Sequence, residues 1–134
     1  MTITRRLAPL TMAAVTALAA APARAATPTE LLATYAAQAG SAPDAARGQD
    51  FFVSRHGREW SCASCHGRAP VTGGQHASTG KAIAPMAPAV EAARFTDAAK
   101  AEKWFRRNCG DVLGRACSPA EKADVLAWLL SLKP

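Results

Sequence analysis

Apolar residues recur at helical spacing in four stretches of the chain, separated by segments rich in Gly, Pro and small polar residues. The first stretch begins at Thr27-Pro28, a favourable N-cap followed by a favourable first helical residue, and reaches Gly40, a residue type that commonly ends helices. We therefore predict a helix over residues 28–39. Its apolar face consists of Leu31, Leu32, Tyr35 and Ala39.

A second helix is predicted over residues 45–54, with Gly48 and Phe52 four positions apart on one face. A glycine there allows another helix to approach closely, and the aromatic ring one turn later fills the adjoining space.

Two further helices are predicted in the C-terminal third of the chain. Thr96 is a favourable N-cap for a helix over residues 97–109, which Gly110 is expected to end. Ser118-Pro119-Ala120-Glu121 combines a capping box with Pro at the first helical position, and it begins the last helix. The residues that share one face are Ala101, Trp104, Phe105 and Asn108 in the third helix, and Val125, Trp128, Leu129 and Leu132 in the fourth.

The long segment between the second and third helices has neither a helical nor a strand period. Residues 67–95 are rich in Gly, Pro, Ser and Thr, and they include Gly73-Gly74 and Ala84-Pro85-Met86-Ala87-Pro88. We expect a functional loop here and no strand, so the fold class is all-α.

Residues 1–25 have the features of an export signal. Arg5 and Arg6 precede a short apolar run, and Ala23-Arg24-Ala25 matches an A-x-A cleavage site. The run is shorter than the ~20 residues of a membrane-spanning helix. We therefore expect cleavage after about Ala25, a periplasmic location, and one small domain over residues 26–134.

The centre of that domain is Cys62-Ala63-Ser64-Cys65-His66, because C-x-x-C-H is the attachment site of a c-type haem. Cys62 and Cys65 are predicted to form thioethers with the haem, and His66 to be the proximal iron ligand. A zinc site would need a second close cysteine pair, and Cys109 and Cys117 are too widely spaced. A thioredoxin-like dithiol would need a βαβ context, which the sequence lacks.

Cys109 and Cys117 are the remaining cysteines, and in an exported protein they are free to form a disulfide. A reactive redox pair is the alternative. The formal net charge is +6, but Arg5, Arg6 and Arg24 lie in the export signal, which leaves about +3. Composition therefore provides no argument for nucleic-acid binding.

The ligand on the other side of the iron decides between electron transfer and small-molecule binding. Met86 is a candidate because its thioether suits ferrous iron and it lies in a Pro-flanked loop. His76 is a weaker candidate in a Gly-rich stretch. Asn108 is unexpected on an apolar face and must either find a partner there or act as a helix C-cap. The spacing alone favours Met86 over Asn108.

The chain resembles the sphaeroides haem protein family, an oxygen-binding, high-spin branch of the class I cytochromes c. The resemblance covers essentially all of residues 26–134. Its matching segments are Ser61–Gly67, Thr79–Pro88, Arg94–Asp97, Glu102–Cys109, Gly114–Cys117, Glu121–Asp124 and Ala127–Leu129.

The resemblance implies a class I cytochrome c-like fold with four to five helices around one covalently bound haem c. It also implies Asn108 as the sixth ligand of the oxidised iron, with Met86 as the alternative, and a disulfide between Cys109 and Cys117. The implied redox partners are a dihaem cytochrome c and a membrane b-type cytochrome. An amide oxygen is a hard donor that ferrous iron binds poorly, so reduction should open the site.

Three functions are compatible with these residues and this resemblance. The first is a monomeric, redox-gated haem protein that binds oxygen, nitric oxide or a similar diatomic molecule and exchanges electrons with partner cytochromes. The second is a plain electron carrier with His66 and Met86 as ligands. The third is a small haem reductase or oxidase, although the sequence shows no obvious distal acid–base residue. We favour electron transfer and ligand binding over a dedicated enzyme.

Overall fold

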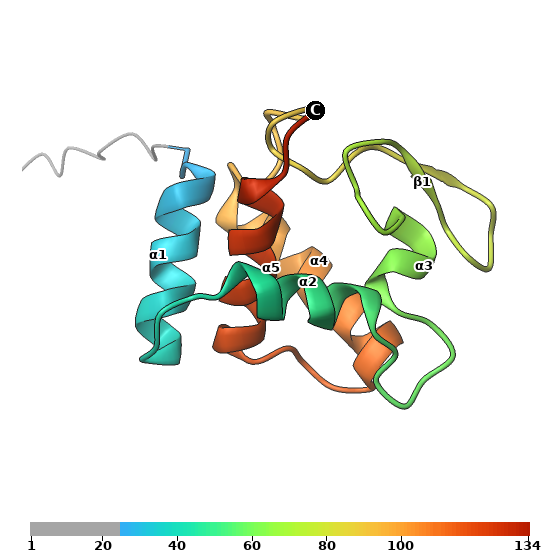
Figure 1. Cartoon of the computed structure of the whole chain (residues 1–134), viewed down its shortest axis with the longest axis horizontal. Coiled ribbons are helices and arrows are strands. Elements are labelled where there is room, and N and C mark those ends of the chain that lie inside the picture. Colours follow the sequence, from blue (N-terminus) through green and yellow to red (C-terminus); the bar gives the residue numbers. More distant parts are fainter. Residues whose placement is uncertain (1–24) are drawn as a thin grey trace, which may run out of the picture.

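The structure is a computed structural model that describes residues 25–134, so the predicted export signal, except for its last residue, lies outside the described residues. Within residues 25–134, no helix has the length and apolar character needed to cross a membrane. The elements are α1 (Pro28–Ala39), α2 (Ala45–Val53), α3 (Cys62–His66), β1 (Gly74–Gln75), β2 (Ala82–Ile83), α4 (Ala98–Leu113) and α5 (Pro119–Ser131) (Figure 1).

The helix starts follow the capping signals. In α1, Glu30 N donates to Thr27 Oγ1 at 3.1 Å and Thr27 N donates to Glu30 Oε2 at 2.7 Å, which completes a capping box. Ser118 and Glu121 form the same reciprocal pair at the start of α5, at 3.2 and 2.7 Å. These bonds satisfy backbone N–H groups that have no partner within the helix.

Helix α5 is the centre of the packing, and both α1 and α2 lie along it. One buried cluster joins α1, α4 and α5, and a second joins α2 and α5. The first cluster is Leu31, Tyr35, Ala101, Ala123 and Leu126, and the second is Phe52, Val125, Trp128 and Leu129. The predicted faces of α1, α2 and α5 are therefore the ones that form the core.

The N-terminus of α2 is docked onto α5 by Asp124, which is 7% exposed. Its carboxylate accepts hydrogen bonds from Asp44 N at 2.6 Å and from Arg47 Nε at 2.9 Å. Asp44 itself caps α2 by accepting from Arg47 N at 3.0 Å. A buried charge is thus fully hydrogen-bonded, as its burial requires.

Both predicted boundaries of the third helix were wrong. Asp97, not Thr96, is the N-cap of α4, and it accepts a hydrogen bond from Lys100 N at 2.9 Å, while the Thr96 hydroxyl donates to Ala93 O. The helix also continues through Gly110 to Leu113 and ends at Gly114, which has a left-handed φ of 72°. A glycine inside a helix destabilises it by only about 1 kcal/mol relative to alanine. Burial of Val112 in the next turn outweighs this cost, so the helix continues past Gly110.

The expectation of no strand was also wrong at one place in the long loop. Gly74–Gln75 and Ala82–Ile83 pair in antiparallel register, Gly74 opposite Ile83. The pair is short, and the rest of residues 67–95 forms turns and irregular loop. The prediction of an all-α fold is confirmed for the helices that build the core.

Candidate haem site

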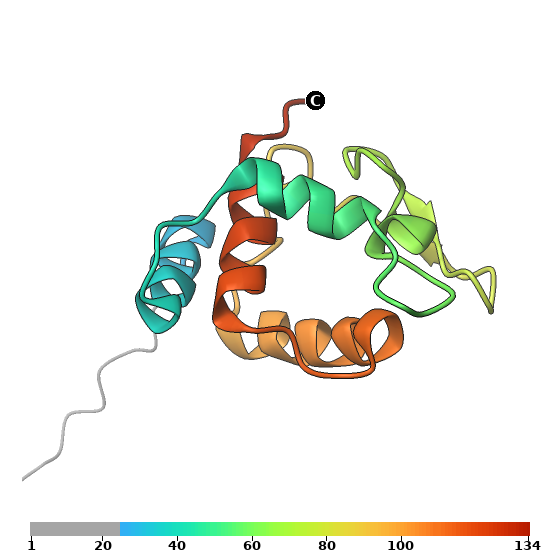
Figure 2. The ribbon, with the colours of Figure 1, turned by 60° about the horizontal axis from the view of Figure 1, so that its bottom comes forward.

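Helices α2, α3, α4 and α5 surround the middle of the molecule, and α4 runs along the opposite side from α2 (Figure 2). A cavity of about 840 Å³, within the usual size range of ligand and cofactor pockets, lies between α3, the loop that leads to α4, and α4 itself. Cys62, Cys65 and His66 line one part of it, while Trp104 and Asn108 line another.

The two motif cysteines lie one turn apart in α3, as attachment to two vinyl groups requires. Ser61 N donates to Ser64 Oγ at 3.0 Å at the start of this short helix, and Gly67 N donates to Ala63 O at 2.9 Å at its end. Burial raises the pKa of the Cys62 thiol to about 11, which keeps it protonated. A low-pKa thiolate, which a redox dithiol needs, is therefore not found at Cys62.

His66 is held against the core by Phe52, whose ring centroid lies 6.1 Å away, and Phe52 in turn packs on Trp128 at 4.9 Å. Burial, helped by the positive charge of Arg94, lowers the pKa of His66 to about 4. The imidazole is therefore neutral at pH 7, the form that ligates a metal. Its Nδ1 is buried without a hydrogen-bond partner among the described residues.

The residues at this cavity fit a haem. Two thiols one helical turn apart, a neutral imidazole next to them and a large, mainly apolar cavity are the donor set and surroundings that haem c requires. Cys62 and Cys65 would hold the porphyrin and His66 the iron.

All three candidates for the sixth ligand line the same cavity. Asn108 is half-buried on α4, and because the helix continues to Leu113, Asn108 is not a C-cap. Met86 also packs against the Phe52 cluster, and its backbone N donates to Pro70 O at 3.0 Å. His76 Nδ1 accepts from Thr79 N at 3.4 Å and lies 3.2 Å from Ser78 Oγ, so this ring nitrogen is already engaged.

Arg94 and Asp111 are cavity residues with polar groups to which the sequence analysis assigned no role. Arg94 lies next to the Met86 loop and donates hydrogen bonds to Pro85 O at 2.7 Å and to Ala84 O at 2.8 Å. No local sequence pattern predicts these contacts. Asp111 lines the cavity one turn after Asn108. The signal for Asp111 was its helical spacing from Asn108, and the wrong helix end at Gly110 concealed it.

Cys109 and Cys117 lie at disulfide distance, with their Cα atoms 5.6 Å apart and both residues buried. This bond joins α4, one residue after Asn108, to the segment just before α5. The predicted pairing therefore agrees with the geometry.

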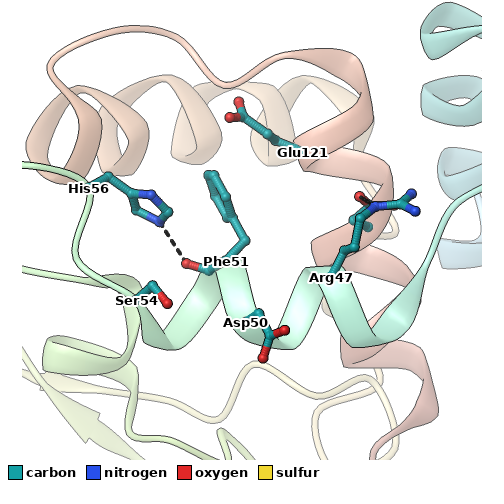
Figure 3. A pocket seen from close by; sticks show the side chains of 7 residues that line it. Arg47, Asp50, Phe51, Ser54, His56 and Glu121 are labelled. Atoms are coloured by element: carbon teal, nitrogen blue, oxygen red, sulfur yellow. Dashed lines mark hydrogen bonds and ion pairs between the residues drawn. The ribbon is translucent and has the colours of Figure 1, made fainter.

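A second, smaller cavity of about 400 Å³ lies between α2 and the start of α5 (Figure 3). Three of its charged side chains have partners: Arg47 pairs with Asp124, and Glu121 pairs with Arg115 at 2.7 Å. The His56 Nε2 lies 2.8 Å from Phe51 O, at the end of α2. These polar groups therefore find their partners within the protein, and they do not require a ligand in this cavity.

Comparison with known proteins agrees with this geometry. A family model described as "domain of unknown function (DUF1924)" matches residues 38–129. Cytochrome c-type protein SHP of Cereibacter sphaeroides is 51% identical over 106 residues, which are 76% of this chain and 81% of that protein. The chain belongs to the SHP family of c-type cytochromes. Its cofactor is haem c, and the prediction of both is confirmed.

Solved structures extend the match to the fold. Oxidised SHP, described as an oxygen-binding cytochrome c, has a TM-score of 0.75 and 48% identity, over 80% of this chain and 98% of that chain. Cytochrome c'' of Methylophilus methylotrophus is 45% identical over 94 residues, 67% of this chain and 65% of that protein. Its oxidised crystal structure has a TM-score of 0.72 and 38% identity, over 80% of this chain and 95% of that chain. The predicted cytochrome c fold is confirmed.

Proposed function

We propose that this protein is a periplasmic monohaem cytochrome c with a redox-gated iron site. In the oxidised state His66 and Asn108 hold the iron from its two sides. In the reduced state Asn108 withdraws, and a diatomic molecule such as oxygen or nitric oxide can bind. Haem supplies an iron that changes oxidation state and has one position open to exchange.

The observation that carries this proposal is the position of Asn108. It lies in the interior of a continuous helix, on the wall of the haem cavity, next to Trp104 along the same face. A half-buried amide at this place has no hydrogen-bond role in capping the helix. Ligation of the iron would satisfy its oxygen and explain a polar side chain on this face.

Donor chemistry then gives the direction of the switch. The amide oxygen of Asn108 is a neutral, hard donor, which suits ferric iron better than ferrous iron. The imidazole of His66 is suited to both states. Reduction therefore weakens the bond to Asn108 and leaves His66 in place.

The relatives support an openable site. SHP is described as an oxygen-binding cytochrome c, and the solution structure of cytochrome c'' is described as giving insight into haem-ligand detachment. These properties belong to those proteins, and we extend them to this chain on the grounds of the shared fold and motif.

Location and partners complete the proposal. The export signal in residues 1–25 places the chain in the periplasm, where Cys109 and Cys117 form a disulfide. A dihaem cytochrome c and a membrane b-type cytochrome deliver electrons to the monomer. The exposed basic residues of α4 provide a surface for an acidic partner.

Two alternatives are supported by particular residues. Met86 lines the cavity and carries a soft thioether, which favours a plain electron carrier with His66 and Met86 as ligands. Asp111 places an ionisable group on the cavity wall, the kind of group that a small haem reductase or oxidase would need.

Absorption spectra of the purified oxidised and reduced protein test the proposal. We expect a low-spin ferric spectrum without the sulfur-to-iron charge-transfer band of methionine ligation. We expect a high-spin ferrous spectrum that changes when nitric oxide or oxygen is added. Low-spin spectra in both states, with the methionine band in the ferric one, would identify a His66–Met86 electron carrier instead.

A further inference from the structure

Helix α4 is attached to the rest of the protein in an unusual way. Helix α5 packs closely on α1 and α2, whereas α4, within the described residues, makes few close backbone approaches to any other helix or strand. The cavity is lined by α4 residues from Lys100 to Val112, along most of the length of the helix. The position of Asn108 therefore depends on a small number of side-chain contacts.

One of these contacts is an ion pair between α4 and α5. Lys122 Nζ donates to both carboxylate oxygens of Glu102, at 2.8 and 3.0 Å. The Lys122 side chain is only 15% exposed, and its ammonium group lies 5.4 Å from the Tyr35 ring centroid and 5.9 Å from that of Phe105. Those two rings pack edge to face at 5.8 Å. The Lys122 end of the pair is therefore covered by aromatic side chains of α1 and α4, whereas the Glu102 side chain is 39% exposed.

The surroundings of Glu102 favour its ionised form. Burial raises the pKa of Glu102, but the hydrogen bonds from Lys122 and the proximity of the Tyr35 hydroxyl outweigh this effect, so the pKa of Glu102 lies below its usual value. The Tyr35 hydroxyl is buried close to Glu102 but outside strict hydrogen-bond geometry. Burial, followed by the polar contact with Glu102 and then by its negative charge, raises the pKa of Tyr35. Glu102 is thus ionised and Tyr35 neutral at pH 7.

The second contact is the Cys109–Cys117 bond, and it lies on the same side of α4 as the ion pair. Glu102 and Cys109 are seven positions apart, which is about two helical turns or roughly 10 Å along the axis. Their partners Lys122 and Cys117 belong to one short segment, the beginning of α5 and the residue just before its N-cap. Two bonds therefore fasten one face of α4 to residues 117–122.

Two points of attachment constrain α4 more than one does. Ala101 and Phe105 hold α4 near α5 by apolar contacts, which fix its rotation only weakly. A bond at Cys109 opposes rotation at one point, and a second bond two turns away opposes both pivoting and rotation. Asn108 lies roughly 100° around the helix from Cys109, so a rotation of α4 would carry its amide along or away from the cavity wall. Neither Glu102 nor Lys122 lines the cavity, so any effect of the ion pair on Asn108 would act through the placement of α4.

We propose that Glu102 and Lys122 are positioning residues for the sixth iron ligand. Together with the Cys109–Cys117 bond they form a two-point clamp that holds α4 at the rotation in which Asn108 reaches the iron. The inference rests on the proposed ligation by Asn108. A partly buried ion pair is well suited to this role because its geometry specifies register and rotation more sharply than apolar contacts do.

The test uses the intact, haem-loaded protein with Glu102→Gln, Lys122→Met and the conservative Lys122→Arg. The first two substitutions are expected to leave haem attachment unchanged and to shift the ferric equilibrium toward high spin by about fivefold, the size of a lost partly buried contact. Lys122→Arg retains the charge and should retain the low-spin spectrum. Arg115→Gln is the matched control, because it removes the Arg115–Glu121 ion pair at 2.7 Å, which does not involve α4.

The outcomes separate this inference from the proposed function. Asn108→Ala is measured in parallel. If Asn108→Ala becomes high-spin while Glu102→Gln and Lys122→Met keep the wild-type ferric spectrum, the clamp is overturned and the ligation stands. A lower melting midpoint without any spectral change has the same meaning, since it shows a purely structural ion pair. If Asn108→Ala leaves the spectrum unchanged, both the ligation and the clamp fail. Should Lys122→Met not fold, Glu102→Gln and Lys122→Arg decide the matter.

Discussion

Gly48 of α2 lies directly against the backbone carbonyl of Asp124 in α5, and a Cβ atom at Gly48 would overlap that carbonyl. This contact sets the distance between the two helices that carry the Phe52 cluster, and Phe52 in turn holds His66 in place. The close approach that a glycine permits therefore supports the haem-binding helix.

Gly48→Ala is expected to lower the free energy of unfolding by about 1–3 kcal/mol, because the backbone atoms of α5 leave no room for a methyl group. Gly110→Ala is the control: a Cβ atom there meets no other atom within 4 Å. That substitution should stabilise α4 by about 0.5–1 kcal/mol, since alanine is the better helix former. Thermal unfolding of the two haem-loaded variants measures the difference, and equal effects would contradict the close contact.

Asn108→Ala should leave haem attachment intact and convert the ferric spectrum from low to high spin, since no other protein ligand replaces the amide. Met86→Leu is the comparison, because it removes the thioether but retains an apolar side chain of similar size. We expect its ferric spectrum to match the wild type. The opposite pattern, with the change in Met86→Leu alone, would assign the sixth position to Met86.

Replacing both Cys109 and Cys117 by serine should lower the melting midpoint and loosen ferric ligation, because the covalent attachment next to Asn108 is lost. The closed loop spans about nine residues, for which the chain-entropy model gives roughly 2.5 kcal/mol. Calorimetry and the ferric spectrum measure the two effects. Mass spectrometry that finds both thiols free in the native protein would exclude the disulfide and its role.

The free energy of unfolding should depend on pH in the acid range through the ionisation of Glu121. The hydrogen bond from Arg115 is the main reason why the pKa of Glu121 is lowered in the folded state. A lowered folded pKa means that the stabilisation is complete above the unfolded value of about 4.3 and is lost as the pH falls through the folded value. The melting midpoint of Glu121→Gln, which keeps the capping hydrogen bond acceptor, should therefore approach that of the wild type as the pH falls from about 5 to about 3. A constant difference across this range would show that the carboxylate charge is not involved.

The basic face of α4 is expected to guide an acidic redox partner. Its exposed residues are Lys100, Lys103, Arg106 and Arg107, and Lys100 and Arg107 also line the haem cavity. Charge attraction acts mainly on the encounter rate and is screened over about 8–10 Å at physiological salt. Reduction by a dihaem cytochrome c should therefore slow as ionic strength rises.

Lys100→Glu combined with Lys103→Glu should slow this reduction further. The control is Arg55→Glu combined with Lys133→Glu, which changes the net charge equally at exposed positions outside α4. Rates that are independent of salt, or equal for the two double variants, would leave these side chains as an ordinary solvated helix face.

Local signals in the sequence determined most of the elements. The N-cap at Thr27, the capping box at Ser118 and the glycine at position 40 predicted helix ends correctly, because these ends depend on hydrogen bonds within a few residues of one another. The C-x-x-C-H motif predicted the cofactor for a similar reason, since both thiols and the imidazole belong to one short helix. The sequence also predicted that another helix could approach closely at Gly48.

Only the tertiary structure decided where α4 ends, which side chains surround the cavity and how α4 is attached. Val112 is buried by its neighbours in the fold, and this burial outweighs the local preference of Gly110 to end a helix. Arg94 and Lys122 make their contacts with residues nine and twenty positions away. Such contacts form because folding brings distant segments of the chain together, and a local sequence pattern cannot predict which segments will meet.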